Sequence, residues 1–364
     1  MSDQRHPISH GSRGAHGSHD APGHGGTGPG WWRRFKRSPF LPASVLTLII
    51  AAAAGLFAGS YTYAMADPTP HRIPVAAVGA PADRERAAAF ADAVSEDLRS
   101  SLDLHEYPAY AGARDALESQ EVFAVLRVPA DIDRNPLMLD VSGASGASVA
   151  ELLTQAARTV DERTGLRVEV RDVKPLGPGD PRGLALFYVS LAAVVTGFIG
   201  AIQMSIHAKA LDPAERIAFT AAYSLLGGFA ITAVVGWLLD AVRFPFVHSW
   251  MILALTMFTS GMVFTMFQAL MGRWAMLPTW GLMVLLGNPS SGGAVSWPLL
   301  PSPLGTIGRW LPPGASVNAQ HTAVYFPGHQ HVQPYLVLAG WAVVSCAVFW
   351  VWRHRHPGGR TAGP

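Results

Sequence analysis

A long stretch almost without charge limits the fold of this chain more than any other feature. Asp240 is the last acidic residue, and between Arg273 and Arg353 the only Asp, Glu, Lys or Arg is Arg309. Charged residues make up about 25% of an average soluble domain, but they make up 14% of this chain. We therefore expect the second half to lie in lipid, which excludes an ordinary soluble enzyme and a disordered chain.

Several apolar segments are long enough to cross a bilayer. A helix needs about 20 residues to span about 30 Å of hydrocarbon. The uncharged segments of this length are 41–66, 183–206, 217–239, 247–270 and 334–352. Segment 274–287 is shorter and contains Pro278, so it spans only if its flanks extend it. Together these segments predict six transmembrane helices.

The first apolar segment has two interpretations. Small residues near Ala64 and Ala66 resemble a cleavage site, as in a secretory signal peptide. The apolar core of a signal peptide is only about 7–15 residues long, however. The basic and aromatic run WWRRFKR at 31–37 also suits a cytosolic interface. The length favours an uncleaved membrane anchor.

The N-terminus is rich in Gly, Ser, Pro and His, which predicts a disordered tail. Five histidines occur there, at positions 6, 10, 16, 19 and 24. Metal binding is one interpretation, but their irregular spacing favours a solvated tail and no resident metal. The single cysteine, Cys346, excludes an intrachain disulfide.

A polar region lies between the first two apolar segments. Strands are expected at 72–79, 121–128, 136–141 and 166–173, and helices at 83–102 and 148–160. Ser148 is expected to cap the second helix, with Glu151 completing a capping box. Strands that alternate with helices predict a small α/β domain.

The segment 288–333 is too apolar for a free loop and too rich in Pro and Gly for a helix. Irregular backbone at membrane depth must be covered by protein or a water-filled cavity. We expect a re-entrant or interface-lying pair of short helices. An ordinary outside loop on the lipid headgroups is the alternative.

Basic residues in the short connections predict the topology. Twelve of them fall on one side if both termini are cytosolic: Arg5, Arg13, Arg33, Arg34, Lys36, Arg37, Lys209, Arg216, Arg273, Arg353, Arg355 and Arg360. The short connections on the other side hold only Arg243 and Arg309. The α/β domain is then extracytoplasmic. The expected parts are a cytosolic tail 1–38, a first span 39–66, the α/β domain 67–182, a membrane domain 183–353 and a cytosolic tail 354–364.

Motifs for an energy source are missing. The lysines are Lys36, Lys174 and Lys209, and none stands in a Walker A motif. The string SSGG at 290–293 is similar to part of an ATPase signature but lacks a nucleotide-binding context. The predicted spans contain no acidic residue, so proton coupling is disfavoured. For His248, an interface position is favoured over a transport role. We expect no cofactor, no catalytic site and no nucleic-acid partner.

Two short polar segments border the spans. In HAKALDPAER at 207–216, Asp212 is expected to cap a helix that has Pro213 at its first position and Glu215 in the box. That helix either docks a partner ATPase or is a plain turn. Asp180 and Arg182 either anchor the second span at the interface or pair with Asp240 and Arg243.

Three stretches resemble a known family. PLGPGDPRGLALFYVSLAAVVTGFIGA at 175–201, ALESQEVFAVLRVP at 116–129 and especially the stretch 287–326 are similar to bacterial phage-infection-protein-like (Pip-type) membrane proteins. These proteins are grouped with type 2 ABC exporter permeases. The resemblance covers about residues 39–353. The outside domain is far shorter than the long helical insert of many members.

The resemblance implies a bacterial plasma-membrane subunit with six spans that works as a homodimer or heterodimer. It implies export of a lipophilic or amphipathic compound, driven by a separate ATP-binding subunit. It implies ATPase coupling through Asp212, Glu215 and Arg216. The outer gate candidates are Asn288, Pro289, Gly292, Gly293, Pro298, Pro312 and Pro313. A non-transporting membrane scaffold or receptor, whose outside domain binds an envelope, secretion-system or phage partner, is the alternative.

Overall fold

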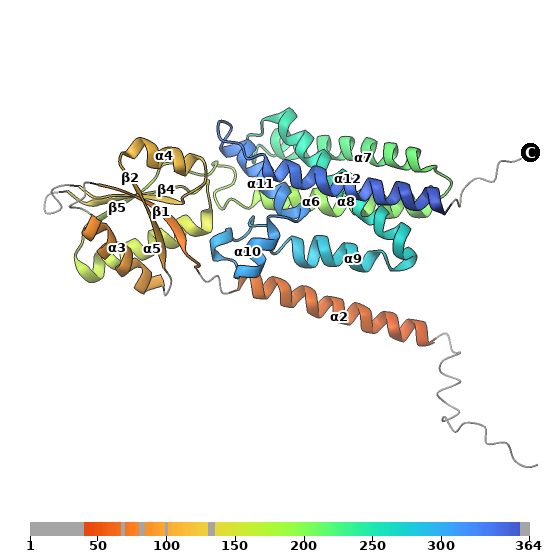
Figure 1. The fold of residues 1–364 in the computed structure, drawn as a ribbon, viewed down its shortest axis with the longest axis horizontal. Helices are drawn as coiled ribbons and strands as arrows, with labels where there is room; N and C mark the ends of the chain where they lie inside the picture. Colours follow the sequence, from red (N-terminus) through yellow and green to blue (C-terminus); the bar gives the residue numbers. More distant parts are fainter. Residues whose placement is uncertain (1–39, 67–69, 80–83, 99–100, 130–134, 357–364) are drawn as a thin grey trace, which may run out of the picture. The chain divides into compact units, whose positions relative to one another are not determined.

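The computed structural model describes residues 40–66, 70–79, 84–98, 101–129 and 135–356 (Figure 1). The predicted tail 1–38 and most of the tail 354–364 lie outside the described residues. The chain divides into two compact units, Met1–Ala54 and Gly55–Pro364. Helix α2 (Phe40–Met65) begins in the first unit and ends in the second. Its 26 residues carry no charge, as expected for a spanning helix.

A mixed five-stranded sheet lies in the region expected to be α/β. Its strands are β1 (Ile73–Val78), β2 (Leu102–Tyr107), β3 (Ala124–Arg127), β4 (Leu137–Val141) and β5 (Val168–Asp172). Their order across the sheet is β2-β1-β3-β4-β5, and only the β3–β4 pair is antiparallel. The four predicted strands are confirmed, and β2 is an additional strand. We call residues 70–182 the sheet domain.

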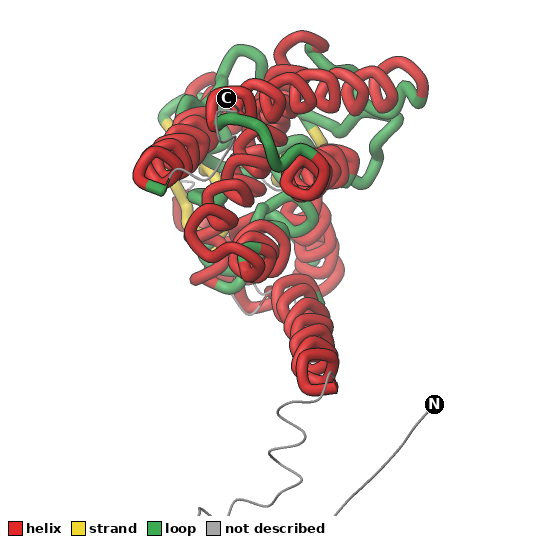
Figure 2. The backbone as a smooth tube through the Cα atoms, turned by 90° about the vertical axis from the view of Figure 1, so that its right-hand side faces the viewer, coloured by secondary structure: helices red, strands yellow, loops and turns green. Residues whose placement is uncertain are grey.

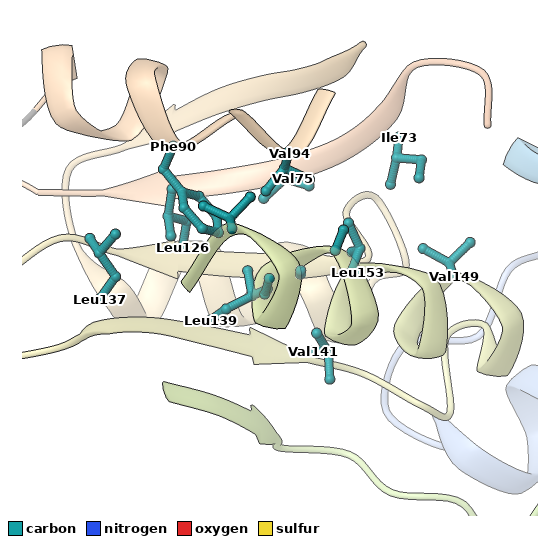
Figure 3. Close-up of a cluster of buried hydrophobic side chains, with 14 of the residues drawn as sticks. Ile73, Val75, Phe90, Val94, Leu126, Leu137, Leu139, Val141, Val149 and Leu153 are labelled. Carbon is teal, nitrogen blue, oxygen red and sulfur yellow. The ribbon is translucent and has the colours of Figure 1, made fainter. Parts of the chain in front are cut away.

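Helices cover both faces of this sheet. The helices are α3 (Arg84–Leu98), α4 (Tyr110–Glu118) and α5 (Ala147–Thr164). Helices α3 and α5 share one face, where Phe90 and Leu153 pack against strand residues such as Leu126 (Figure 3). Helix α4 packs on the other face through Ala113 and Leu117. Helix α3 joins the parallel strands β1 and β2, and α5 joins β4 and β5, because parallel neighbours need a crossover connection.

The predicted cap of α5 is wrong. The helix begins at Ala147, with Gly146 as its N-cap, and no side chain caps it. Ser148 therefore lies inside the first turn, and its hydroxyl donates to Ser296 Oγ at 2.9 Å. The Ser148 hydroxyl therefore binds a residue far along the chain and does not cap the helix.

The second half of the chain is a helical bundle. Its long helices are α6 (Ala185–His207), α7 (Pro213–Ala233), α8 (Phe246–Met271) and α12 (Gln333–Arg355). Helix α7 continues as a π-helical turn, Val234–Leu238. With α2, the described residues contain five helices long and apolar enough to cross a membrane. Helices α6, α7 and α12 run beside α8 within the bundle, which Figure 2 shows almost end-on.

The sixth predicted span is shorter than the others. The 3₁₀ turn Gly272–Trp274 precedes helix α9 (Met276–Trp280), which continues as a π-helix, Gly281–Gly287. The apolar helix Met276–Gly287 is below the length of a straight span. This agrees with the expectation that segment 274–287 spans only with help from its flanks.

Helix α8 lies at the centre of the bundle, since it packs against α6, α7 and α12. Small residues let these helices approach closely. A Cβ atom at Gly197 of α6 would lie 2.5 Å from Met257 O, and one at Gly228 of α7 would lie 2.7 Å from Ala254 N. Large apolar side chains such as Leu226 and Val343 are exposed on the outside. An apolar exterior with small residues between the helices is typical of a membrane bundle.

The pair of short helices expected in segment 288–333 is present. A 3₁₀ turn, Trp297–Leu299, leads into α10 (Ser302–Gly308) and then α11 (Pro312–Tyr325). Every residue of α11 from Pro312 to Gln320 is buried. Helix α11 contacts α6, α8 and α12. Helix α11 is therefore part of the bundle core, and this part of the segment is not a free loop.

Candidate functional site

The residues expected to form an outer gate come together around the start of α11. Pro312 and Pro313 open this helix, where their missing N–H groups cost no hydrogen bond. A Cβ at Gly287 would lie 2.6 Å from Pro313 Cγ, next to Asn288, which is 2% exposed. The following turn packs against α10 so tightly that a Cβ at Gly308 would overlap Ser290 O.

The gate candidates Gly292 and Gly293 lie where a side chain would not fit. Gly292 has φ +79°, a left-handed conformation that side chains disfavour. A Cβ there would lie 2.5 Å from the Trp297 indole, and a Cβ at Gly293 would lie 3.0 Å from Phe187. The Trp297 ring also lies 4.7 Å from the guanidinium of Arg309. The lone charge of the 274–352 stretch is thus held over an aromatic face.

The other gate candidates occupy the same outer segment. Pro289 follows Asn288 in the turn after the π-helix. Pro298 lies in the 3₁₀ turn, and its carbonyl accepts a 2.8 Å hydrogen bond from His71 N, just before β1. Ser296 N donates to Ser148 Oγ at 3.0 Å. The sheet domain therefore rests directly on the segment that carries the gate candidates.

A row of polar side chains lies between α8 and α11. Thr256 Oγ1 donates to Ser316 Oγ at 2.8 Å, and Gln320 Nε2 donates to Ser249 O at 2.8 Å. We call Ser249, Thr256, Ser316 and Gln320 the polar seam. All four are fully buried. Ser249 Oγ and Gln320 Oε1 have no hydrogen-bond partner among the described residues. Buried groups without partners are costly, so such positions favour water or a polar ligand.

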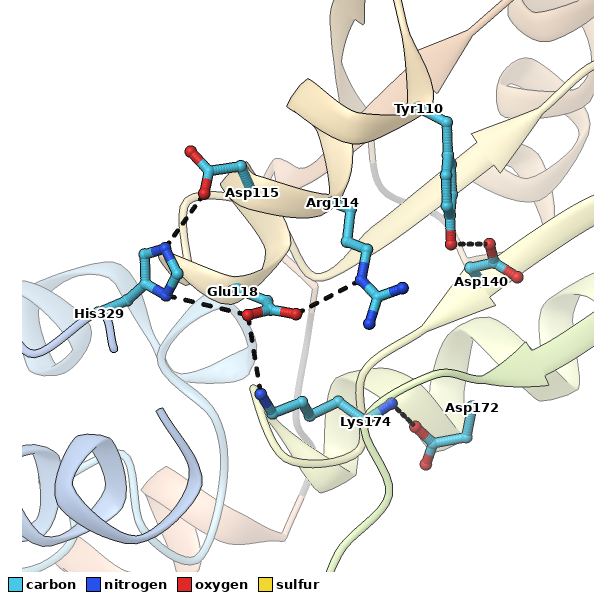
Figure 4. A network of polar contacts seen from close by, with 8 residues as sticks. All are labelled: Tyr110, Arg114, Asp115, Glu118, Asp140, Asp172, Lys174 and His329. Carbon is cyan, nitrogen blue, oxygen red and sulfur yellow. Dashed lines mark hydrogen bonds and ion pairs between the residues drawn. The ribbon is translucent and has the colours of Figure 1, made fainter. Parts of the chain in front are cut away.

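A second contact joins the sheet domain to the loop before α12 (Figure 4). His329 Nε2 lies 3.1 Å from Asp115 Oδ1, and its Nδ1 lies 3.9 Å from Glu118 Oε2. Arg114 and Lys174 also reach Glu118, at 3.4 and 4.0 Å. These side chains are partly exposed, so each pair contributes at most about 1 kcal/mol.

Asp180 and Arg182 have different surroundings at the start of α6. The carboxylate of Asp180 is 7% exposed and accepts hydrogen bonds from Leu184 N at 3.0 Å and Ala185 N at 2.9 Å. It therefore holds the helix start, which is the anchoring role. Arg182 is exposed, and no ion pair joins it or Asp180 to Asp240 or Arg243 in the structure as described. The alternative pairing with that loop is not found.

The segment proposed to couple to an ATPase forms the expected cap. Asp212 and Glu215 make a reciprocal capping box at the start of α7, with Pro213 at its first position. Glu215 Oε2 accepts from Asp212 N at 2.9 Å. Arg216 reaches Gln268 Oε1 on α8 at 3.0 Å. The cap is confirmed, and the docking of a partner stays a prediction.

The interface histidine His248 has a specific partner. Its Nε2 lies 2.8 Å from the hydroxyl of Tyr335, and the two rings stack with centroids 5.9 Å apart. His248 thus ties the start of α8 to the start of α12. Nothing in this contact favours transport over anchoring.

The junction between the sheet domain and the bundle encloses a small cavity of about 60 Å³. The loop before α5, the loop before α6, the gate segment and α11 all contribute to its wall. Gly292 and Gly293 are among the lining residues. Sequence reasoning missed Gln120 and Asn318, which also line it, because neither belongs to a recognisable motif.

Neither comparison with known proteins nor a search for metal ligands assigns a role to these residues. No family model, curated protein or solved structure matches the chain. Among the described residues, no group of three His, Cys, Asp or Glu is placed to hold a metal ion. The five N-terminal histidines lie outside the described residues. The site must therefore be interpreted from its own chemistry.

Proposed function

We propose that the chain is the membrane subunit of a bacterial exporter similar to type 2 ABC permeases. In this proposal it has six spans, both termini are cytosolic and the sheet domain lies outside the plasma membrane. A separate ATP-binding subunit supplies the energy, and two membrane subunits work as a homodimer or heterodimer. The exported compound is lipophilic or amphipathic.

The observation that carries this proposal is the buried short helix α11 beside the polar seam. Transporters build their substrate paths from interrupted helices, whose irregular backbone is tolerated at membrane depth when it lines a cavity. Helix α11 begins with Pro312 and Pro313, follows the broken segment 288–311 and places Ser316 and Gln320 against α8. In a bundle with a purely structural role, polar groups buried without full hydrogen bonding would lower stability and bring no benefit.

An apolar groove on α12 supports a lipophilic substrate. The groove has a volume of about 470 Å³ and is lined by apolar side chains, with Gln333 as its polar end. Trp310 and Trp341 form part of its wall, and Trp341 Nε1 donates to Trp310 O at 2.9 Å. Such a groove suits an acyl chain or another extended apolar group.

Transport is tested in inverted membrane vesicles that contain the full chain and its ATP-binding subunit. A fluorescent lipid analogue should accumulate when ATP is present. Gln320→Leu, which removes the amide of the polar seam, should lower the initial rate about tenfold. Gln203→Leu makes the same change at an exposed position of α6 and should leave the rate unchanged. Equal rates in both variants, or transport that survives a Walker mutation in the partner, would exclude the mechanism.

A second candidate function is a non-transporting scaffold or receptor. It is favoured by the sheet domain, which has its own core and rests on the bundle at both Ser296 and His329. This function requires residues 67–182 and no ATPase. A phenotype that persists without the ATP-binding subunit but disappears when the domain surface is mutated would select it.

A further inference from the structure

The start of α5 is a helix N-terminus without an internal anion. The N–H of Ser145 already donates to Ser142 O at 3.1 Å. The next three N–H groups, from Gly146 to Ser148, donate to no acceptor among the described residues. The first turn contains no acidic residue. Unpaired N–H groups and the helix dipole together favour a negative charge at this position.

Helix α6, whose first turn also lines the cavity, gives a direct comparison. Its first N–H groups are satisfied by the buried carboxylate of Asp180, which the chain itself supplies. Helix α5 lacks such a carboxylate, and its start lines the junction cavity. The two helix starts differ in whether the chain provides the anion.

Polar side chains from distant segments converge on this cavity. Asn318 of α11 is 9% exposed, and its Oδ1 has no hydrogen-bond partner among the described residues. Gln120 lines the same cavity with a buried Nε2 that also has no partner. Asn318 lies in α11 and Gln120 in the turn after α4, and these two amide atoms lack partners within the described chain, which is unusual for buried groups.

The cavity wall contains one arginine, Arg182, which makes no ion pair with any described residue. The imidazole of His321 also lines the cavity. No Asp or Glu is among the residues of its wall. The volume of about 60 Å³ corresponds to a few water molecules or one small group. The site therefore combines N–H donors, an amide donor, a guanidinium and one amide acceptor.

We propose that this junction cavity binds a phosphate group that carries a neighbouring hydroxyl or amine. The phosphate oxygens accept from the start of α5, Gln120 Nε2 and Arg182, while the hydroxyl or amine donates to Asn318 Oδ1. A phospholipid headgroup and a soluble phosphate ester share this chemistry. Binding would tie the sheet domain to α11, and it does not depend on whether the chain transports.

The test uses the full chain in uncharged detergent micelles, followed by its thermal unfolding midpoint. Three probes are compared: glycerol phosphate, phosphatidylglycerol in the micelles and diacylglycerol with the same acyl chains. A ligand that binds the native state raises the midpoint with concentration. A rise with glycerol phosphate identifies a soluble ester as sufficient. A rise with phosphatidylglycerol alone identifies the lipid headgroup.

Two variants and one control locate the effect. Arg182→Gln and Gln120→Gly should each weaken the phosphate-dependent shift by about tenfold in apparent affinity, since each removes a hydrogen bond to a charged group. Gln120 has φ +58°, which glycine adopts freely, so this variant should fold normally. Arg171→Gln removes another exposed arginine of the same domain and should bind like the wild type.

Three results would overturn the proposal. The first is no shift with either phosphate probe. The second is a shift with diacylglycerol equal to that with phosphatidylglycerol, because the acyl chains alone would then explain it. The third is a shift that survives in both Arg182→Gln and Gln120→Gly, because the phosphate would then bind elsewhere.

Discussion

The sheet domain and the helical bundle differ in how many polar side chains they bury beside apolar ones. The core between the sheet and its two shared-face helices is aliphatic, with Phe90 as its largest member. The centre of the bundle buries hydroxyls and amides, such as Thr256, Ser260 and Gln320, alongside its apolar side chains, and it exposes Leu and Val on its outside. The sheet domain is held together by removal of apolar surface from water. The bundle depends on close packing and hydrogen bonds, because lipid is as apolar as its own side chains.

The largest effect is expected in the domain core. Phe90 is 2% exposed, and Phe90→Ala should destabilise the domain by about 3–5 kcal/mol through lost burial and a cavity. Hydrogen exchange of β1 and β3 in the full chain measures this loss. Leu226→Ala, at a position of α7 that is 72% exposed, should change stability by less than about 0.5 kcal/mol. Similar losses in both variants would contradict the comparison.

A buried ion pair in the same domain should give the next effect. Asp140 is fully buried and lies 3.0 Å from Arg127, and its carboxylate also accepts from Tyr110 at 2.8 Å. Burial, and then this hydrogen bond, raise the pKa of Tyr110. Asp140→Ala should cost about 3 kcal/mol, the low end for a broken buried pair, because Arg127 is one-third exposed.

The control for the buried pair is the exposed pair of Arg72 and Asp103. Its side chains are 78% and 38% exposed. Asp103→Ala should therefore change the free energy of unfolding by no more than about 1 kcal/mol. Denaturant titration of the full chain, followed by hydrogen exchange of the sheet, compares the two. Equal effects would mean that burial does not set the strength of these pairs.

Close packing should matter more than hydrogen bonding within the bundle. Gly228→Val places side-chain atoms against the backbone of Ala254, where even a Cβ would be 2.7 Å from N. Overpacking of this kind typically costs about 1–3 kcal/mol. Gly340→Ala on α12 meets no atom within 4 Å and should be neutral. Thermal unfolding in detergent distinguishes the two variants, and a neutral Gly228→Val would show that α7 and α8 separate easily.

The smallest effect is expected for a hydroxyl of the polar seam. Thr256→Val keeps the shape of the side chain but removes its 2.8 Å hydrogen bond to Ser316. Hydrogen bonds between membrane helices contribute about 0.6 kcal/mol on average. The unfolding midpoint should therefore fall only slightly. A loss as large as that of Gly228→Val would mean that hydrogen bonds, and not packing, dominate the bundle.

The sequence predicted features that depend on neighbouring residues. The apolar segments became long helices because hydropathy and length are local properties. The capping box of Asp212 and Glu215 was also predictable, since its partners are three residues apart. Strand β2, with the sequence LDLHEY, was missed because this edge strand has no buried residue and so lacks a strong apolar alternation.

The junction could not be predicted in the same way. Ser148 has the spacing of a helix cap, yet its hydroxyl meets Ser296, which is 148 residues away. Gln120 and Asn318 become neighbours of one cavity only when the sheet domain settles on α11. No local sequence pattern predicts that these two residues lie at one cavity. Whether a polar side chain is buried without a hydrogen-bond partner depends on the whole fold.

The two π-helical turns affect how the chain tolerates changes in length. Such a turn holds one residue more than an α-turn, so losing one residue from Val234–Leu238 or Gly281–Gly287 can leave an ordinary α-turn behind. The same deletion in α8 would rotate every later side chain of the helix by about 100°. Residues that now pack against α6, α7 and α12 would then point elsewhere. Among functional variants, single-residue deletions should therefore be found in the two π-helical segments and be absent from α8.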